Sequence, residues 1–263
     1  MDRGILGILF DLQGTLLDPR PRTGDARALF DAGTAKVYAL LATRGCALPP
    51  FERFLRQQHS HARRIDWITW FTGGEPDARR LLRRLCTDYG LQRDQASLAL
   101  LGGLWYGPTA ELAELPGDVI PTLTTLRDAD IKLGLVVNTF WQGEVIDRHL
   151  ESLGLLEFFT VRAYSSEHGS RKPHPNLFRA ALGEMKLPAD QVIFVGDDPA
   201  TDLVGARRVG MKAVLRAATP SKRGRKLADY IIQRIGQLTE IFQPVSEPSR
   251  PPMMLPPLNA VAT

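Results

Sequence analysis

The sequence predicts an α/β fold built on one parallel sheet, with an all-helical segment inserted near the N-terminus. Three observations predict it. A continuous apolar run at residues 5–12 is typical of a parallel strand that is buried on both faces. Residues 25–113 show helical spacing of apolar side chains and no strand-like run. After Pro116-Gly117, short apolar runs alternate with helical patterns, and this alternation favours right-handed crossovers within a single sheet.

The first predicted strand is followed by a loop and then by the helical insert. Glycine and proline are frequent in the segment GTLLDPRPRTG at residues 14–24, so we expect a loop there. Within the insert, apolar residues recur at the spacing that places them on one face of a helix. They are Ala28, Leu29, Ala32, Ala35, Leu40, Leu81, Leu82 and Leu85.

The C-terminal half of the chain supplies the alternating elements. Short apolar runs predict strands at residues 132–137, 159–163, 192–196, 212–215 and 230–232. Helical patterns predict helices at residues 119–126, 144–153 and 175–185, and a further helix that follows Asp198 and ends at Val209. The basic segment SKRGRK at residues 221–226 is expected to be an exposed turn between the last strands and not a nucleic-acid site.

These elements divide the chain into three parts. We predict a core formed by residues 1–18 and 115–243, and a helical insert at residues 19–114. The remaining residues, 244–263, are rich in proline and carry little that a core could bury. We therefore predict that this C-terminal tail is disordered.

The composition is that of an ordinary globular protein, with 44% hydrophobic and 24% charged residues. The net charge of +4 is small for a chain of this length, and the basic residues are scattered, so no nucleic-acid partner is expected. Cys46 and Cys86 are too few for a disulfide framework and fit a reducing compartment. No signal-peptide cleavage site and no apolar run of about 18 residues occurs, so we expect a cytoplasmic protein without a membrane segment.

Polar side chains follow three of the predicted strands at the point where each strand ends. They are Asp11, the pair Asn138-Thr139 and the pair Asp197-Asp198. In an open α/β sheet, ligands bind beyond the carboxyl ends of the strands, so these side chains are expected to share one crevice. Asp202 lies shortly after the third pair, and Lys172 precedes a helix. Carboxylate oxygens suit Mg²⁺, and a lysine would balance the remaining negative charge of carboxylates and substrate.

Four segments of the sequence, in this order along the chain, resemble the four ordered motifs of the haloacid dehalogenase superfamily of hydrolases. The segments are FDLQGTLLD, LGLVVNTF, RKPHPNLF and VGDDPATDLVGARRVGM. The resemblance covers residues 5–16 and 115–243. It implies a Rossmann-like three-layer core, a helical cap at residues 19–114, Mg²⁺ as cofactor and hydrolysis of a small phosphorylated metabolite. It also implies a monomer or a homodimer.

The resemblance also implies a role for each site residue. Asp11 would be the nucleophile that attacks phosphorus and forms an aspartyl-phosphate, and Lys172 would hold both the phosphoryl group and the Asp11 carboxylate. Asp197 would bind the metal directly, whereas Asp202 would bind it or orient its waters. The backbone carbonyl of Gln13 would be a further metal ligand. Asn138, Thr139 and Lys172 would bind the phosphoryl group.

Two positions depart from the pattern of phosphatases in this superfamily. The residue two places after the nucleophile is usually an aspartate that transfers protons, and here it is Gln13. An amide does not transfer a proton near neutral pH, so turnover is expected to be slow. The residue before Asn138 is usually serine or threonine, and here it is Val137. We hypothesise that Thr139 partly replaces the missing hydroxyl.

Because of these departures, four functions remain open. The first is a slow Mg²⁺-dependent phosphatase, and the second is a phosphotransferase with a long-lived phosphoenzyme. The third is a catalytically weak binding or regulatory protein. The fourth is a haloacid dehalogenase, which would need no metal. The two acids Asp197 and Asp202 argue against a dehalogenase. Phe178 does so too, because dehalogenases carry a tyrosine at that position.

Other features of the sequence have two interpretations each. Aromatic residues of the insert would form either a lid over the substrate or the packing between the insert's own helices. They are Trp67, Trp70, Phe71, Trp105 and Tyr106. Arg79, Arg80, Arg83 and Arg84 would form either an anion-binding face or a solvated helix face. The five histidines show no metal-ligand spacing, and His174 is expected to start a helix.

Overall fold

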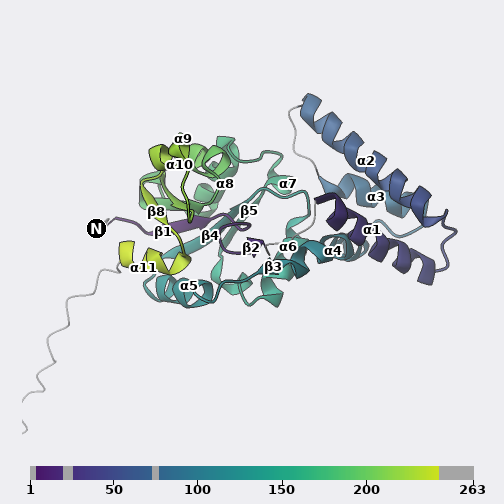
Figure 1. Cartoon of the computed structure of the whole chain (residues 1–263), viewed down its shortest axis with the longest axis horizontal. Coiled ribbons are helices and arrows are strands. Elements are labelled where there is room, and N and C mark those ends of the chain that lie inside the picture. Colours follow the sequence, from purple (N-terminus) through teal and green to yellow (C-terminus); the bar gives the residue numbers. More distant parts are fainter. Residues whose placement is uncertain (1–3, 20–25, 73–76, 243–263) are drawn as a thin grey trace, which may run out of the picture.

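The computed structural model describes residues 4–19, 26–72 and 77–242 (Figure 1). Within these residues, six parallel strands form one sheet in the order β5-β4-β1-β6-β7-β8. The strands are β1 (Gly7–Phe10), β4 (Lys132–Val137), β5 (Val161–Tyr164), β6 (Val192–Gly196), β7 (Lys212–Arg216) and β8 (Tyr230–Ile232). The parallel α/β sheet predicted from the sequence is confirmed.

Strand β1 lies at the centre of the sheet, and its register places the strand ends side by side. Phe10, its last residue, is opposite Leu135 of β4 and Val195 of β6. Strands β1, β4 and β6 therefore finish close together at the same edge. Each is hydrophobic along most of its length and buried on both faces, as a central parallel strand must be.

Helices cover both faces of the sheet and make it the middle of three layers (Figure 1). On one side lie α8 and α9, and on the other side α5, α6 and α11. Alternate strand residues face opposite layers, because successive side chains of a strand point to opposite faces. The core helices are α5 (Val119–Asp128), α6 (Gly143–Ser152), α7 (Ser165–His168), α8 (Pro175–Met185), α9 (Val204–Arg208), α10 (Lys222–Leu227) and α11 (Leu238–Ile241).

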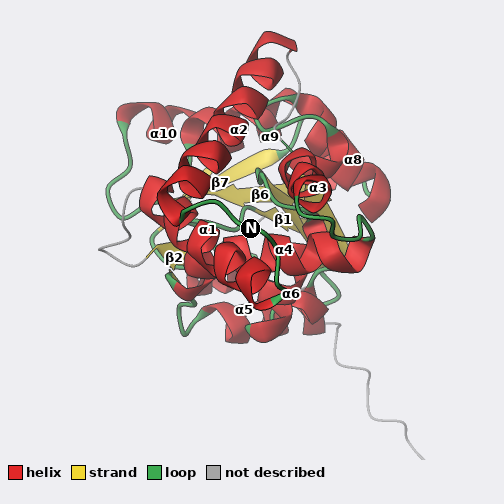
Figure 2. Ribbon diagram, turned by 90° about the vertical axis from the view of Figure 1, so that its right-hand side faces the viewer, coloured by secondary structure: helices red, strands yellow, loops and turns green. Residues whose placement is uncertain are grey.

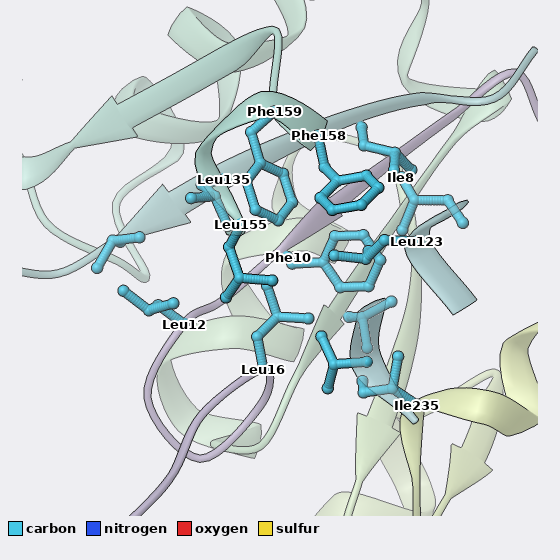
Figure 3. Close-up of a cluster of buried hydrophobic side chains, with 14 of the residues drawn as sticks. Ile8, Phe10, Leu12, Leu16, Leu123, Leu135, Leu155, Phe158, Phe159 and Ile235 are labelled. Carbon is cyan, nitrogen blue, oxygen red and sulfur yellow. The ribbon is translucent and has the colours of Figure 1, made fainter. Parts of the chain in front are cut away.

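The layer on the α5 side has a core rich in phenylalanine and leucine (Figure 3). Phe10 of β1 packs edge-to-face against Phe159, with ring centroids 6.3 Å apart. Leu12 and Leu16, from the loop after β1, are buried in the same cluster. That loop is therefore fixed by burial of its apolar side chains on the sheet, although it carries little regular structure.

Among the described residues between β2 (Asp18–Pro19) and β3 (Ala113–Glu114), two short strands that pair antiparallel, lie four helices. They are α1 (Ala26–Thr43), α2 (Phe51–Thr72), α3 (Ala78–Asp88) and α4 (Gln95–Glu111). Asp77 and Asp94 start α3 and α4, since their side chains accept hydrogen bonds from backbone N–H groups in the first turn. Figure 2 looks onto these helices, which lie in front of the strands.

The inserted helices have a hydrophobic core of their own. Val37 and Leu41 of α1, Leu82 of α3 and Trp105 of α4 are buried in one cluster. The Trp105 indole N–H donates to the Thr34 hydroxyl at 2.9 Å, so its polar atom has a partner inside the cluster. The insert is thus packed as a unit, joined to the sheet through the β2–β3 pair and through α4.

The structure differs from the sequence predictions in three places. The short strand β2 lies within the segment expected to be a loop, at residues 14–24. Strand β5 begins at Val161, because Phe158 lies in a short 3₁₀ turn and Phe159 turns inward onto the core. The basic segment expected to be a turn forms helix α10. The side chain of Ser221 caps this helix by accepting from Gly224 N, and lysine and arginine are good helix formers.

Two further predictions concern a membrane segment and the C-terminal tail. None of the described helices combines the length and the apolar character required to cross a bilayer. The predicted disordered tail at residues 244–263 lies outside the described residues.

Candidate carboxylate site

Three carboxylates meet at the edge of the sheet where β1 and β6 end. Asp11 directly follows β1, and Asp197 directly follows β6. Asp202 comes from the π-helical turn Pro199–Leu203 that follows. One ligand oxygen from each of these residues lies within 4.8 Å of the others. The structure therefore brings together the three acids that the sequence assigned to one site.

Lys172 lies inside this cluster. Its Nζ is 2.5 Å from Asp11 Oδ1 and 2.8 Å from Asp202 Oδ1, and the side chain is almost completely buried. Burial alone would favour the neutral amine, but the two carboxylates outweigh it and raise the pKa of Lys172. The ammonium group is therefore charged, and it ties Asp11 to Asp202.

Asn138, at the end of β4, fixes the backbone of Lys172. Lys172 N donates to Asn138 Oδ1 at 2.7 Å, and Asn138 Nδ2 donates to Lys172 O at 3.2 Å. Both ends of the carboxamide are thus engaged with the lysine that reaches the site. The predicted contact of Asn138 with a phosphoryl group stays a prediction, and the contact in the structure is one that positions Lys172.

Asp202 joins the lysine to the loop after β6. Its Oδ2 accepts from the backbone N–H groups of Asp197 and Asp198, at 3.1 Å each, while its Oδ1 faces Lys172. The Asp202 carboxylate lies directly against Gly196, the last residue of β6. A side chain at this position would overlap the carboxylate, so glycine is required there. Because Asp202 is buried and both oxygens are engaged, it holds the loop that presents Asp197.

Asp197 is the exposed carboxylate of the cluster. The Thr15 hydroxyl donates to its Oδ1 at 3.5 Å, and Gly14, with φ +80°, passes so close that a Cβ there would overlap its carboxylate. Partial burial removes water from the Asp197 carboxylate and is the main reason that its pKa is raised to about 6. The negative charges of Asp11 and Asp202 raise it further. Burial is also the main influence on Asp11 and raises its pKa, although Lys172 opposes it.

The charge of the site fits a hard cation. Among the described residues of this cluster, three carboxylates face the ammonium group of Lys172, so negative charge is left uncompensated. Burial first, and then repulsion from Asp11 and Asp202, raise the pKa of Asp197. The donor atoms that converge are carboxylate oxygens, which Mg²⁺ prefers. The residues present therefore fit the predicted metal, and the role of each carboxylate as a ligand stays a prediction.

Arg216, at the end of β7, holds the loop that follows β1. Its Nη1 donates to the carbonyls of Gly14 and Thr15, at 3.0 and 3.1 Å, and the guanidinium forms a two-pronged ion pair with Asp18. That pairing raises the pKa of Arg216. No sequence pattern predicted this role, because an arginine at a strand end has no motif around it.

Gln13 lies in this loop, and its side chain is exposed. Tyr106 comes from α4 of the insert and is itself 3.0 Å from Nδ1 of His149 on α6. Burial raises the pKa of Tyr106 to about 12, and the Gln13 amide opposes this shift. Sequence reasoning missed this contact: Tyr106 was considered only as lid or packing, and His149 carries no motif.

The second polar residue after β4, Thr139, is engaged within its own loop. Its Oγ1 accepts from Trp141 N at 3.0 Å, and its backbone N–H donates to Ser165 Oγ at 2.9 Å. Val137, where a hydroxyl residue is usual, is buried in the core. Binding of a phosphoryl group by Thr139 stays a prediction, and in this structure the hydroxyl stabilises a turn.

Several of the remaining candidates have structural partners. Trp105 packs inside the insert, as the packing interpretation expected, whereas the side chains of Trp67, Trp70 and Phe71 lie outside the described residues. Arg79 pairs with Glu167 across the boundary between insert and core, at 3.2 Å. His174 starts α8, as expected, and its Nδ1 accepts from Asn176 N at 3.3 Å.

Comparison with known proteins places the chain among named enzymes. It is 31% identical over 169 residues to the glyceraldehyde 3-phosphate phosphatase of Pyrococcus furiosus. This match covers 62% of this chain and 67% of that protein. It is 28% identical over 223 residues to the phosphoglycolate phosphatase of Salmonella paratyphi A, which covers 81% of each chain. Among glyceraldehyde 3-phosphate phosphatases, the matched part spans from 41% to 67% of the relative's length.

Solved structures show the same fold. A HAD phosphatase from Thermococcus onnurineus superposes with a TM-score of 0.58 at 22% identity, over 91% of this chain and 99% of that one. The 2-haloacid dehalogenase of Pseudomonas syringae pv. Tomato DC3000 gives a TM-score of 0.58 at 25% identity, over 90% and 97%. Residues 5–210 match the model of the haloacid dehalogenase-like hydrolase family. With its motifs at the strand ends, its inserted helices and this match, the chain belongs to the haloacid dehalogenase-like hydrolases.

Proposed function

We propose that the protein is a Mg²⁺-dependent phosphatase that hydrolyses a small phosphorylated metabolite through an aspartyl-phosphate on Asp11. The observation that carries the proposal is the Lys172 ammonium, which lies between Asp11 and Asp202 at 2.5 and 2.8 Å beside an exposed third carboxylate. This arrangement suits a phosphoryl dianion, because the ammonium of Lys172 and the proposed cation site both supply positive charge next to the Asp11 carboxylate. The relatives named as phosphatases of glyceraldehyde 3-phosphate and phosphoglycolate support it.

Asp11 is the proposed nucleophile. One of its carboxylate oxygens attacks phosphorus and forms the new P–O bond, while the bond to the leaving oxygen breaks and that oxygen departs with the electron pair. Lys172 lowers the repulsion between the carboxylate and the phosphoryl oxygens. Water then attacks phosphorus, releases inorganic phosphate and restores Asp11.

The metal would be held by residues of the same edge. Asp11, Asp197 and the backbone carbonyl of Gln13 would be direct ligands, and Asp202 would bind it or orient its waters. A bound Mg²⁺ would supply positive charge against the phosphoryl oxygens. Asp202, with one oxygen on two backbone N–H groups and the other on Lys172, acts in this proposal mainly by placing Asp197 and the lysine.

The residue Gln13 determines the turnover rate that we expect. Because the amide does not transfer a proton, the leaving oxygen departs without an acid at this position and the hydrolytic water lacks a base there. Loss of a general acid or base typically costs about 10²–10⁴ in rate. We therefore expect slow turnover and a preference for leaving groups that need little protonation. The same residue favours the second candidate, a catalytically weak binding or regulatory protein of the same fold.

The test compares wild type, Asp11→Asn and Gln13→Asp on an aryl phosphate, each with Mg²⁺ and with EDTA. The phosphatase proposal expects wild-type turnover with Mg²⁺ that is lost in EDTA and in Asp11→Asn, with a phosphoenzyme trapped by acid. Wild-type turnover at background, restored by orders of magnitude in Gln13→Asp, would instead support the binding protein. Release of halide from a 2-haloacid in EDTA would support a dehalogenase.

A further inference from the structure

A cavity of about 300 Å³ lies between the inserted helices and the core. The insert contributes Arg79 and Arg83 of α3, and Arg93 from the segment between α3 and α4. The core contributes Gln142, the residue before α6, and Glu167 of α7. The four charged residues of the carboxylate site are not among the described residues that line this cavity. Its volume is within the range of small-molecule sites, so it is a candidate for a second ligand.

The arginines of α3 divide between the cavity and the solvent. Arg79 and Arg83 are four residues apart, which places them on the same face of the helix, and both line the cavity. Arg84 lies one position further round the helix and pairs with Asp88 of the same helix at 3.6 Å. Of the two interpretations of this arginine cluster, an anion-binding face therefore applies to the side that carries Arg83.

The carboxylates that line the cavity already have partners. Glu167 pairs with Arg79 at 3.2 Å, across the boundary between insert and core. Glu144 pairs with Arg148 at 2.8 Å and accepts a hydrogen bond from Gln95 Nε2 at 3.1 Å. These carboxylates therefore do not neutralise the other two arginines of the cavity.

Two guanidinium groups and one buried carboxamide remain for a ligand. Arg83 and Arg93 form no ion pair with another described residue. Gln142 is only 8% exposed, and its Oε1 has no hydrogen-bond partner in the described part of the chain. A buried polar atom without a partner is rare in folded proteins. Because the terminal torsion of a glutamine is soft, the carboxamide can turn toward a ligand in the cavity.

We propose that this cavity binds a small anion, a molecule with a phosphate or carboxylate group, between Arg83 and Arg93 of the insert and Gln142 of the core. The planar guanidinium group matches the oxygens of either anion with two N–H donors, and the carboxamide supplies a further hydrogen bond. Because the partners come from both sides of the boundary, the bound anion holds the insert against the core. The inference goes beyond the proposed phosphatase function, since this site requires neither a metal nor a reaction at Asp11.

Calorimetric titration of the whole chain with inorganic phosphate and with malonate tests the proposal. The metal is first removed on a chelating resin, and EDTA is left out because its own carboxylates would compete. We expect at least one of the two anions to bind at one per chain, and Arg83→Ala and Arg93→Ala each to weaken that binding about tenfold or more. Tighter binding of phosphate would indicate a phosphorylated ligand, and tighter binding of malonate a carboxylate ligand. Binding of neither anion would overturn the proposal.

Two control variants locate the bound anion. Arg84→Ala removes the same charge from the same helix, but outside the cavity, and should leave Kd unchanged. An equal weakening in Arg84→Ala and Arg83→Ala would mean that α3 attracts anions only through its total charge. Asp11→Asn should also leave Kd unchanged. A Kd that changed in Asp11→Asn and not in Arg83→Ala would place the anion in the carboxylate site, and either result would overturn the proposal.

The variant Gln142→Met tests the contribution of the core. Methionine keeps the length of the side chain without its hydrogen bonds, and the glutamine makes no side-chain capping bond at the start of α6. We therefore expect weaker binding of the anion, by about tenfold, without a fall in melting temperature. An unchanged Kd would contradict the bridge between insert and core. Absence of phosphatase activity in wild type would contradict the proposed function alone, because none of these titrations depends on turnover.

Discussion

Asn138 holds Lys172 by its backbone, with one hydrogen bond of 2.7 Å to the lysine N–H and one of 3.2 Å to the lysine carbonyl. The two residues are 34 positions apart and come from the end of β4 and the segment before α8. Because the lysine's ammonium is buried between Asp11 and Asp202, the strand end sets the position of the site's positive charge. Several of the properties predicted below depend on that charge.

Replacement of Asn138 by alanine should weaken both folding and activity. Two hydrogen bonds to a buried backbone are lost, which should lower the free energy of unfolding by about 2 kcal/mol. The lysine loses its backbone support, so we expect a fall in kcat with a smaller change in KM. Urea unfolding and steady-state kinetics with an aryl phosphate measure the two effects. An unchanged kcat in Asn138→Ala, with the expected loss of stability, would speak against the role given to Asn138.

Replacement of Lys172 by methionine removes the ammonium but keeps the length of the side chain. Two carboxylates then face each other without a partner in a buried site, and metal-free protein should lose about 3–5 kcal/mol of stability. Added Mg²⁺ should recover part of this loss, because it supplies positive charge at the same cluster. Unfolding curves with Mg²⁺ and with EDTA measure both. A variant as stable as wild type in EDTA would mean that the three carboxylates do not depend on the lysine.

Asp197 should make the stability of the metal-free protein depend on pH. Its pKa is raised to about 6, above the ordinary value of 3.8, so between these values the folded state binds more protons than the unfolded state. Stability from this group is therefore highest below about pH 4 and falls as the pH rises to about 6. Asp197→Asn should remove that slope and, in EDTA at pH 7.5, raise stability by about 1 kcal/mol, a modest gain because the group is partly solvated.

The same variant should lose its response to the metal. Thermal unfolding at pH 4.5 and 7.5, with and without Mg²⁺, measures both properties of Asp197→Asn. Asp198→Asn serves as the neighbouring control, since Asp198 accepts from Ala200 N and Thr201 Oγ1 outside the cluster. If Mg²⁺ stabilised Asp197→Asn as much as wild type, Asp197 would not be a metal ligand.

Replacement of Arg216 by lysine should loosen the loop after β1. A lysine carries a compact charge and lacks the planar fork that bonds Asp18 while it donates to the carbonyls of Gly14 and Thr15. Because the same loop presents the Gln13 carbonyl, we expect Mg²⁺ affinity to fall about tenfold, roughly the effect of one lost hydrogen bond. Calorimetric titration with Mg²⁺ measures it. Unchanged affinity, with a lower melting temperature, would limit Arg216 to a structural role.

The sequence was sufficient for the sheet and for the edge at which the site forms. Continuous apolar runs mark strands buried on both faces, and parallel strands end at the same edge, so Asp11 and Asp197 were expected together before any coordinates. Four of the predicted strands agree with the structure to within one residue, at 132–137, 192–196, 212–216 and 230–232. The segment 221–226 was wrongly expected to be a turn, because a run of basic residues fits an exposed loop, whereas the N-cap at Ser221 starts a helix there.

Tertiary structure alone decided other polar contacts. Arg216 contacts Gly14 from 202 positions away, and His149 contacts Tyr106 from 43. No local periodicity encodes such pairs, because they depend on how loops and helices from separate parts of the chain pack above the sheet. The sequence by itself determined where the strands lie in the chain and which acids follow them, through burial and the geometry of parallel pairing. The order of the strands in the sheet and the contacts of Arg216 and of Tyr106 followed only from the folded chain, where short-range hydrogen bonds and charge select among the neighbours that packing brings within reach.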